Sequence, residues 1–284
     1  MNFTKLLKNA YKNGGITIKP KRTTIYYMEP IIPLTEEQER QLLEGDGQKK
    51  ERNEYKQINS STGLAVNYYK ILESLGKIEG LWFEEKVEKP LKIKGGRKAN
   101  LDVAYKSEGK QYYIESKFLE PYYSGNEHNT ESYFKKEYYD VPDNDKDAWY
   151  ALLLDSQNYK IYNFSQLCRH LMAIWRKHKE DKQLDIVFQS VIWKMTDKFI
   201  ENIDNEEDKE ILRSRIIVID KEAKSAKSRI DKFLADIGWK NITFECIYYN
   251  DILEDIVLYT DIPDEVIFEH YDGINFVQDD FINE

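Results

Sequence analysis

The sequence contains few cysteines and no long apolar run. Its 284 residues include only two cysteines, Cys168 and Cys246. Two thiols cannot form a disulfide framework in a chain of this length, and no Cys/His cluster has zinc-site spacing. No stretch reaches the roughly 18 apolar residues of a membrane helix, and the basic N-terminus lacks the apolar segment of a secretory signal. We therefore expect a soluble, uncleaved protein of a reducing cytoplasm, with no membrane partner.

Glycine and proline are also scarce, at 13 and 7 residues, which excludes a collagen-like chain. Hydrophobic residues make up 41% of the chain and aromatic residues 13%, enough to build a sizeable core, so global disorder is excluded as well. The length suits one large domain with insertions.

The formal net charge of −9 argues, taken alone, against a protein that binds phosphate groups. The charge is unevenly distributed, however. Residues 241–284 contain twelve acidic residues and no Lys or Arg, which leaves residues 1–240 with a net charge of +3. Between Met1 and Met28 every charged side chain is basic. The negative net charge of the whole chain therefore comes from the acidic C-terminal region, and the charge of residues 1–240 is compatible with phosphate binding.

Three regions are predicted: a basic N-terminal arm and linker at 1–59, a core at 60–195, and a C-terminal region with a helix, a strand and an acidic tail at 196–284. Folded structure is expected to begin at Ser60. Helical spacing of apolar residues, with serine caps, predicts helices over 61–75 and, from Ser165, over 165–179. Strand character predicts five strands, over 81–87, 100–105, 111–118, 184–194 and 241–249.

A long helix is predicted between Asn205 and Gly238, because apolar residues there recur at alternating steps of four and three. The alternative is a short strand over Ile216–Ile219. The same spacing matches a heptad, so the helix either packs on its own sheet or forms the seam of a homodimer.

The most informative segment is a predicted hairpin with a two-residue turn at Glu108 and Gly109. If Ser107 pairs with Lys110, counting back along both strands places Asp102 opposite Glu115. Side chains alternate along a strand, so Lys117 lies on the same face. That face also carries Asn100, whereas the opposite face is apolar.

Two facing carboxylates lie about 5 Å apart at Cβ and repel each other unless a cation lies between them. Mg²⁺ suits this position, because it binds one or two protein carboxylates together with waters and phosphate oxygens. Lys117 adds a fixed amino group that, as an ammonium, can orient a water or stabilise charge on phosphorus and, as the neutral amine, can accept a proton from the water. The chemistry that this face suggests is hydrolysis of a phosphodiester.

The pattern of Asp102, twelve intervening residues and Glu115-Ser116-Lys117 resembles the PD-(D/E)XK nuclease superfamily, which includes many restriction endonucleases. The segments ANLD (99–102) and YYIESKF (112–118) carry the resemblance. The segments SSTGLAVNYY (60–69), IESKFLEPY (114–122) and QLCRHL (166–171) are similar to a bacterial restriction-endonuclease-like branch. The resemblance covers residues 60–195 and implies an α/β fold with a central mixed sheet flanked by helices, in the order α-β-β-β-α-β.

The resemblance also implies site residues. Asp102 and Glu115 would bind Mg²⁺, with Mn²⁺ as a substitute, and Lys117 would be the catalytic lysine. Many members add an upstream acidic residue, for which three candidates remain open: Glu84, Glu85 and Glu73. Leu101 stands where many members have proline. Gln166 and His170 resemble a Gln-x-x-x-Tyr helix motif with His in place of Tyr, and a half-covered helix face is the alternative for this pair.

Basic residues are concentrated in the connection before the predicted strand 100–105, which carries Asp102. Gly95 and Gly96 in this connection permit close approach of the backbone to a phosphate. We expect phosphate contacts from Lys92, Lys94, Arg97 and Lys98, in a run that also contains Lys86 and Lys89; a solvated charge run is the alternative. Five tyrosines, together with Lys135 and Lys136, suit either base stacking or core packing: Tyr122, Tyr123, Tyr133, Tyr138 and Tyr139. Asn67 is interpreted as a local cap.

These features predict a Mg²⁺-dependent DNA endonuclease of restriction type, with a companion DNA methyltransferase as a further expectation. Two alternatives stay open. The first is a non-catalytic interaction protein on a nuclease-like scaffold, although a scaffold has no need of facing carboxylates. The second is a nuclease that acts on RNA, on damaged DNA or on junctions.

Overall fold

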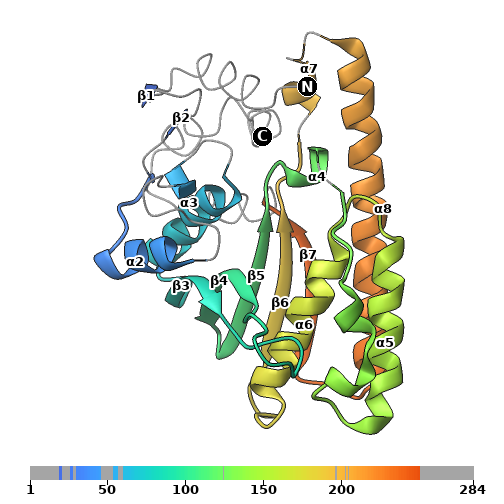
Figure 1. Ribbon diagram of the computed structural model, residues 1–284. Helices are drawn as coiled ribbons and strands as arrows, with labels where there is room; N and C mark the ends of the chain where they lie inside the picture. Colours follow the sequence, from blue (N-terminus) through green and yellow to red (C-terminus); the bar gives the residue numbers. More distant parts are fainter. Residues whose placement is uncertain are drawn as a thin grey trace.

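A five-stranded mixed β-sheet between two layers of helices forms the centre of the molecule (Figure 1). The computed structural model describes residues 19–20, 26–27, 30–45, 54–56, 60–123, 125–195, 197–201, 203 and 205–249. Most of the basic arm and the acidic tail after 249 lie outside these residues. The predicted α/β fold, with its α-β-β-β-α-β core order, is confirmed.

The strands of the sheet follow the order β3-β4-β5-β6-β7. Their bounds are β3 Glu79–Lys86, β4 Asn100–Ser107, β5 Lys110–Lys117, β6 Ile186–Ile192 and β7 Ile242–Tyr248. The first three strands pair antiparallel, and β5, β6 and β7 are parallel to one another. Two further strands of two residues each, β1 (Lys19–Pro20) and β2 (Tyr26–Tyr27), pair antiparallel with each other in a separate sheet.

The β4–β5 hairpin has the predicted register. Ser107 pairs with Lys110 and Val103 with Ile114, so the next position along the two strands places Asp102 beside Glu115. Glu108 and Gly109 both have positive φ, at 51° and 75°, as a type I′ turn requires. The right-handed twist of this turn matches that of the strands, and the register of the two carboxylates follows from it.

The helices of the structure are α2 (Glu36–Glu44), α3 (Ser61–Ser74), α4 (Glu120–Tyr123), α5 (Lys146–Asp155), α6 (Phe164–His178), α7 (Asp197–Glu201) and α8 (Glu206–Asp236). Short 3₁₀ turns occupy 54–56, 131–134, 136–138, 143–145 and 156–158. Helices α2 and α3 lie on one side of the sheet, and α5, α6 and α8 on the other (Figure 1). Ser60 caps α3 as predicted, because its Oγ accepts from the Gly63 N–H at 3.1 Å.

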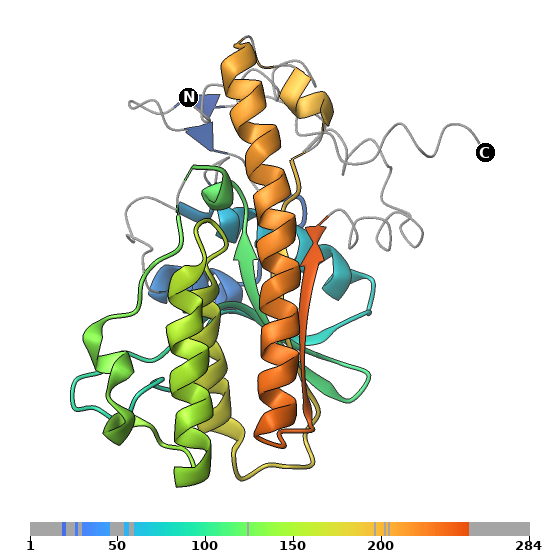
Figure 2. The ribbon, with the colours of Figure 1, turned by 90° about the vertical axis from the view of Figure 1, so that its right-hand side faces the viewer.

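Helix α8 confirms the long helix and excludes the short strand over Ile216–Ile219. It runs beside α5 and β7 (Figure 2), and its buried side chains include Ile219, Ala226 and Phe233. The Phe233 ring lies 4.5 Å from that of Trp149 on α5. The interpretation of α8 as a helix packed on its own sheet is therefore correct, and a homodimer remains a prediction. No helix in the described part of the chain has the length and apolar character needed to cross a membrane.

Two local predictions were wrong, and one helix was missed. Folded structure begins before Ser60, because α2 starts at a capping box formed by Thr35 and Gln38, and Gln41 Oε1 accepts from the Phe83 N–H of β3 at 3.0 Å. Helix α5 was not anticipated. Ser165 does not cap α6: the N-cap position is Asn163, whose side chain makes no capping hydrogen bond, while Ser165 is fully buried and hydrogen-bonded to Ser156.

Buried His178, at the end of α6, makes a pH-dependent contribution to stability. Its Nε2 lies 2.8 Å from the Tyr113 hydroxyl. Burial, helped by the charge of Lys177, lowers the pKa of His178 from 6.5 to about 4. Because the unfolded chain takes up this proton at higher pH than the folded one, the contribution is complete above pH 6.5 and is lost as the pH falls towards 4.

We expect the free energy of unfolding to fall by about 1–2 kcal/mol over this range because of His178, after allowance for solvent screening. The His178→Gln protein should lose that part of the slope, whereas His128→Gln, which changes an exposed histidine, should keep it. Urea unfolding followed at several pH values between 7 and 4 measures the difference. Equal slopes for the wild type and His178→Gln would contradict the assignment.

Candidate active site

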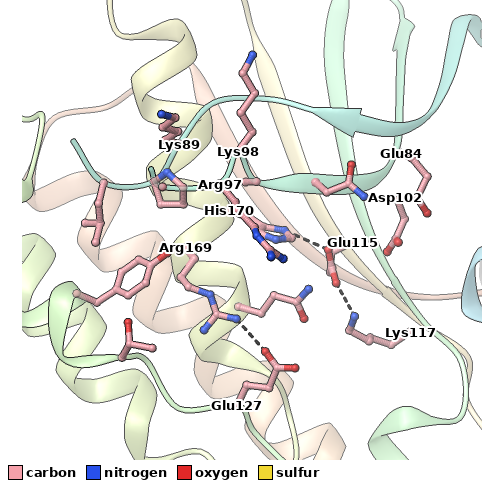
Figure 3. Close-up of a pocket in the computed structure, with 18 of the residues that line it drawn as sticks. Glu84, Lys89, Arg97, Lys98, Asp102, Glu115, Lys117, Glu127, Arg169 and His170 are labelled. Carbon is pink, nitrogen blue, oxygen red and sulfur yellow. Dashed lines mark hydrogen bonds and ion pairs between the residues drawn. The ribbon is translucent and has the colours of Figure 1, made fainter. Parts of the chain in front are cut away.

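A cavity of about 1050 Å³ opens where β4 and β5 meet the N-terminus of α3 and one face of α6 (Figure 3). Most of the predicted site residues line it: Glu84, Arg97, Lys98, Asn100, Asp102, Glu115, Lys117, Gln166 and His170. The carboxylates of Glu84, Asp102 and Glu115 lie at one end (Figure 3). The side chains of Lys89, Arg97 and Lys98, from the 87–99 connection, line another side, which we call the cationic wall (Figure 3). We call this cavity the pocket.

Glu115 is the most enclosed acidic side chain of the pocket, with 3% of it exposed. Its Oε1 accepts from Lys117 Nζ at 2.5 Å, and its Oε2 lies 3.1 Å from His170 Nδ1. Asp102, beside it, accepts from the Ser116 backbone N–H at 2.6 Å. The hairpin register therefore brings together the three residues that the sequence singled out.

The two neighbouring carboxyl groups titrate differently. Burial, together with the charges of Glu115 and Glu84, raises the pKa of Asp102 well above its ordinary value. Burial acts in the same direction on Glu115, but Lys117 and His170 outweigh it and lower the pKa of Glu115 to about 2. Burial would lower the pKa of Lys117, yet the surrounding carboxylates raise it. Negative charge is thus concentrated here and only partly neutralised.

Glu84 is the upstream acidic residue that the structure brings to this cluster. It accepts from the Asn100 side-chain amide, and its other oxygen lies 3.5 Å from Thr62 Oγ1. Its φ of 55° is left-handed, a conformation that costs a non-glycine residue of the order of 1 kcal/mol or more and that interrupts the alternation of β3. Sequence alone gives no signal for this turn of the backbone.

The other two upstream candidates lie elsewhere. Glu85 forms an ion pair with Lys177 at 2.8 Å, outside the pocket. Glu73 accepts from Lys70 Nζ at 2.6 Å and from Gln38, and so connects α3 to α2. Asn67 likewise holds the N-terminal segment, because its Oδ1 accepts from the Ile31 N–H at 2.9 Å. Its contact is therefore 36 residues away rather than local.

Helix α6 supplies His170 and Gln166 and also a residue that the sequence reading missed, Arg169, which lines the pocket. The only signal for Arg169 was its place beside His170. The segment before α6 is fixed by Glu222 of α8, whose carboxylate accepts from three successive backbone N–H groups, those of residues 160–162, at 2.8–2.9 Å. These three hydrogen bonds fix where α6 begins, and so where its side chains line the pocket.

Only some of the predicted phosphate-contacting residues reach the pocket. Arg97 and Lys98 line it together with Lys89, whereas Lys92 and Lys94 do not. Lys135 and Lys136 also lie outside it and form ion pairs with Glu131 and Asp147. Among the tyrosines, Tyr133 lines the pocket, while Tyr122 and Tyr139 are buried in the core.

No three His, Cys, Asp or Glu side chains among the described residues form a ready-made metal-binding group. A Mg²⁺ site needs fewer, since this ion binds through one or two carboxylates and fills its other positions with waters and phosphate oxygens. Asp102 and Glu115 supply two adjacent carboxylates. Asn100 Oδ1 is a buried oxygen without a hydrogen-bond partner in the described structure, at the same end of the pocket. The donor set therefore fits Mg²⁺.

Comparison with known protein families gives a match over most of the chain. Residues 3–227 match the model of the family REase-ARP, described as "Restriction Endonuclease associating with ARP". The match extends the resemblance found over 60–195 towards both ends of the chain. Searches of curated proteins and of solved structures find no significant match.

Proposed function

This chain belongs to the restriction-endonuclease family REase-ARP, and we propose that it is an active, Mg²⁺-dependent endonuclease that hydrolyses phosphodiester bonds of DNA. The observation that carries the proposal is the cluster of Asp102, Glu115 and Lys117 at the end of the pocket. A nuclease-like scaffold that had lost its activity would gain nothing from enclosing Glu115 beside a second, partly buried carboxylate.

In this proposal Asp102 and Glu115 hold Mg²⁺, or Mn²⁺ in its place, and Glu84 is the upstream acidic residue. When bound, the ion supplies positive charge against the phosphate and lowers the pKa of water. Lys117 orients the attacking water and stabilises negative charge on the phosphate oxygens. His170 acts as a positioning residue, because its Nδ1 lies 3.1 Å from the second oxygen of Glu115.

The cationic wall supports a nucleic acid as the substrate. Lys89, Arg97 and Lys98 line the pocket and have no ion-pair partner in the part of the chain that the structure describes. Cationic side chains that are not neutralised by acids remain available to phosphate oxygens on both sides of the bond to be cut. A companion DNA methyltransferase, which would protect the host sequence, remains part of the proposal.

Incubation of the purified protein with duplex DNA, single-stranded DNA and RNA, each with Mg²⁺, Mn²⁺, Ca²⁺ or EDTA, tests the proposal. We expect products from duplex DNA with Mg²⁺ or Mn²⁺ and none with EDTA. If only RNA yields products, the substrate is RNA and not DNA. Absence of cleavage of every substrate, with Mg²⁺ present, would leave the non-catalytic interaction protein as the better account.

A further inference from the structure

A third side of the pocket differs chemically from the carboxylate end and from the cationic wall. It consists of polar side chains from the segment 127–133 and from α6: Glu127, Thr130, Ser132, Tyr133 and Arg169. We call it the polar wall. Arg169 and Glu127 lie across the pocket from Lys89 and Lys98, and away from the carboxylates (Figure 3). The proposed function does not use these residues.

The polar wall rests on a network of buried hydrogen bonds. Asn129 donates to Ser156 Oγ at 3.1 Å, and its backbone N–H donates to Gln157. Asn126 donates to the Ser156 carbonyl at 2.8 Å and accepts from the Ser165 N–H. Ser156 and Ser165 are both fully buried. The segment has little regular secondary structure, yet its position is fixed before any ligand arrives, which lowers the entropic cost of binding.

Arg169 is held in one orientation by this support. Its guanidinium donates to Glu127 Oε2 at 3.0 Å and to Asn129 Oδ1 at 3.1 Å, and it lies 6.0 Å from the centre of the Tyr133 ring. A guanidinium has five N–H donors, so these two bonds leave others for a ligand. Glu127 is largely exposed, and its Oε1 has no partner among the described residues.

The polar wall and the cationic wall differ in net charge, and we therefore expect them to bind different parts of the DNA. Arg169 and Glu127 neutralise each other, whereas Lys89, Arg97 and Lys98 are not neutralised by any described acid. Phosphate groups therefore favour the cationic wall. The polar wall instead offers donors and acceptors side by side, which is the chemistry that base edges require.

We propose that the polar wall contacts base edges of the DNA next to the bond that is cut, and that Arg169 and Glu127 together read one G·C pair. Arginine donates to O6 and N7 of guanine, and a glutamate oxygen accepts from the N4 amino group of cytosine. This inference rests on the proposed function, because it assigns the specificity of the same site.

The test uses a duplex library with randomised sequence, which is cleaved with Mg²⁺ and sequenced at the cut ends. Wild-type products should show a G·C pair at one fixed distance from the cut. The variants Glu127→Gln and Arg169→Gln should reduce discrimination at that position by about five- to hundredfold and leave preferences at other positions unchanged. The matched control is Arg229→Gln, which changes an arginine paired with Asp155 outside the pocket and should leave the profile unaltered.

The outcomes separate the two proposals. Cleavage by the wild type with the same base preference in both variants would overturn the role of the polar wall and leave the proposed function intact. A uniform loss of cutting across all sequences would also overturn it, because that is the signature of a phosphate contact. Absence of any cleavage by the wild type would overturn the proposed function and this inference with it.

Discussion

Replacing Lys117 with alanine is expected to lower the rate of DNA cleavage by roughly 10²–10⁴-fold, a range typical of a positioned group that acts in the transition state. The Lys117 ammonium is the cation nearest to the carboxylates, at 2.5 Å from Glu115 Oε1. The Lys117→Arg protein keeps the charge but not its placement, so it should recover little activity. Single-turnover cleavage of a duplex oligonucleotide measures both rates.

Folding must be checked separately, because removal of Lys117 leaves buried Glu115 without its ammonium partner. Circular dichroism and thermal unfolding should show a folded protein with a lower Tm. Lys227→Ala is the matched control: Lys227 is paired with Asp231 on the outside of α8, and its loss should leave the rate unchanged. A Lys117→Ala protein that cuts within threefold of the wild-type rate would remove Lys117 from the catalytic role.

The Asp102→Asn substitution is expected to abolish Mg²⁺-dependent cleavage and also the stabilisation of the folded protein by Mg²⁺. That stabilisation should reach about 2.7 kcal/mol for the wild type when the Mg²⁺ concentration is 100 times the Kd. Without metal, the variant should be more stable than the wild type, because Asp102 is partly buried beside Glu115 and Glu84 and the substitution removes a repelling charge. Asparagine retains an oxygen to accept from the Ser116 N–H.

Thermal unfolding with and without Mg²⁺ separates these effects. Glu85→Gln is the control, because Glu85 neighbours Glu84 in sequence but is paired with Lys177 outside the pocket. It should retain both cleavage and stabilisation by Mg²⁺. An Asp102→Asn protein whose Tm still rises with Mg²⁺ as much as that of the wild type would place the ion elsewhere.

The placement of Asp102, Glu115 and Lys117 on one face of the hairpin could be predicted, because it depends on short-range geometry. A two-residue turn at Glu108 and Gly109 fixes the register of the hairpin, and the period of two along each strand then fixes which side chains share a face. Asp102, Glu115 and Lys117 lie within sixteen residues of one another, so no knowledge of the rest of the fold was needed to bring them together.

The parts that could not be predicted depend on contacts between distant segments. Glu84 reaches the cluster and Glu85 does not, because Glu84 itself has a left-handed backbone conformation within β3. No residue type in that strand indicates this conformation. The pairing of Arg169 with Glu127 spans 42 residues. Lys135 and Lys136 differ from Arg97 and Lys98 for a more local reason, because they pair with Glu131 and Asp147, four and eleven residues away in the chain.

The distribution of charge explains how an acidic chain can present a site for phosphate groups. Many surface cations of the described structure are paired with acids, whereas those along one wall of the pocket are not. The net charge of −9 therefore says little about the potential inside the pocket. What matters locally is the separation of unneutralised cations from the carboxylate end.

The most direct measurement of the central claim is cleavage of a supercoiled plasmid by the purified protein, with Mg²⁺ and with EDTA, next to the folded Lys117→Ala protein. We expect nicked or linear DNA only from the wild type, and only with Mg²⁺. Equal cleavage by both proteins, or cleavage that persists in EDTA, would contradict it.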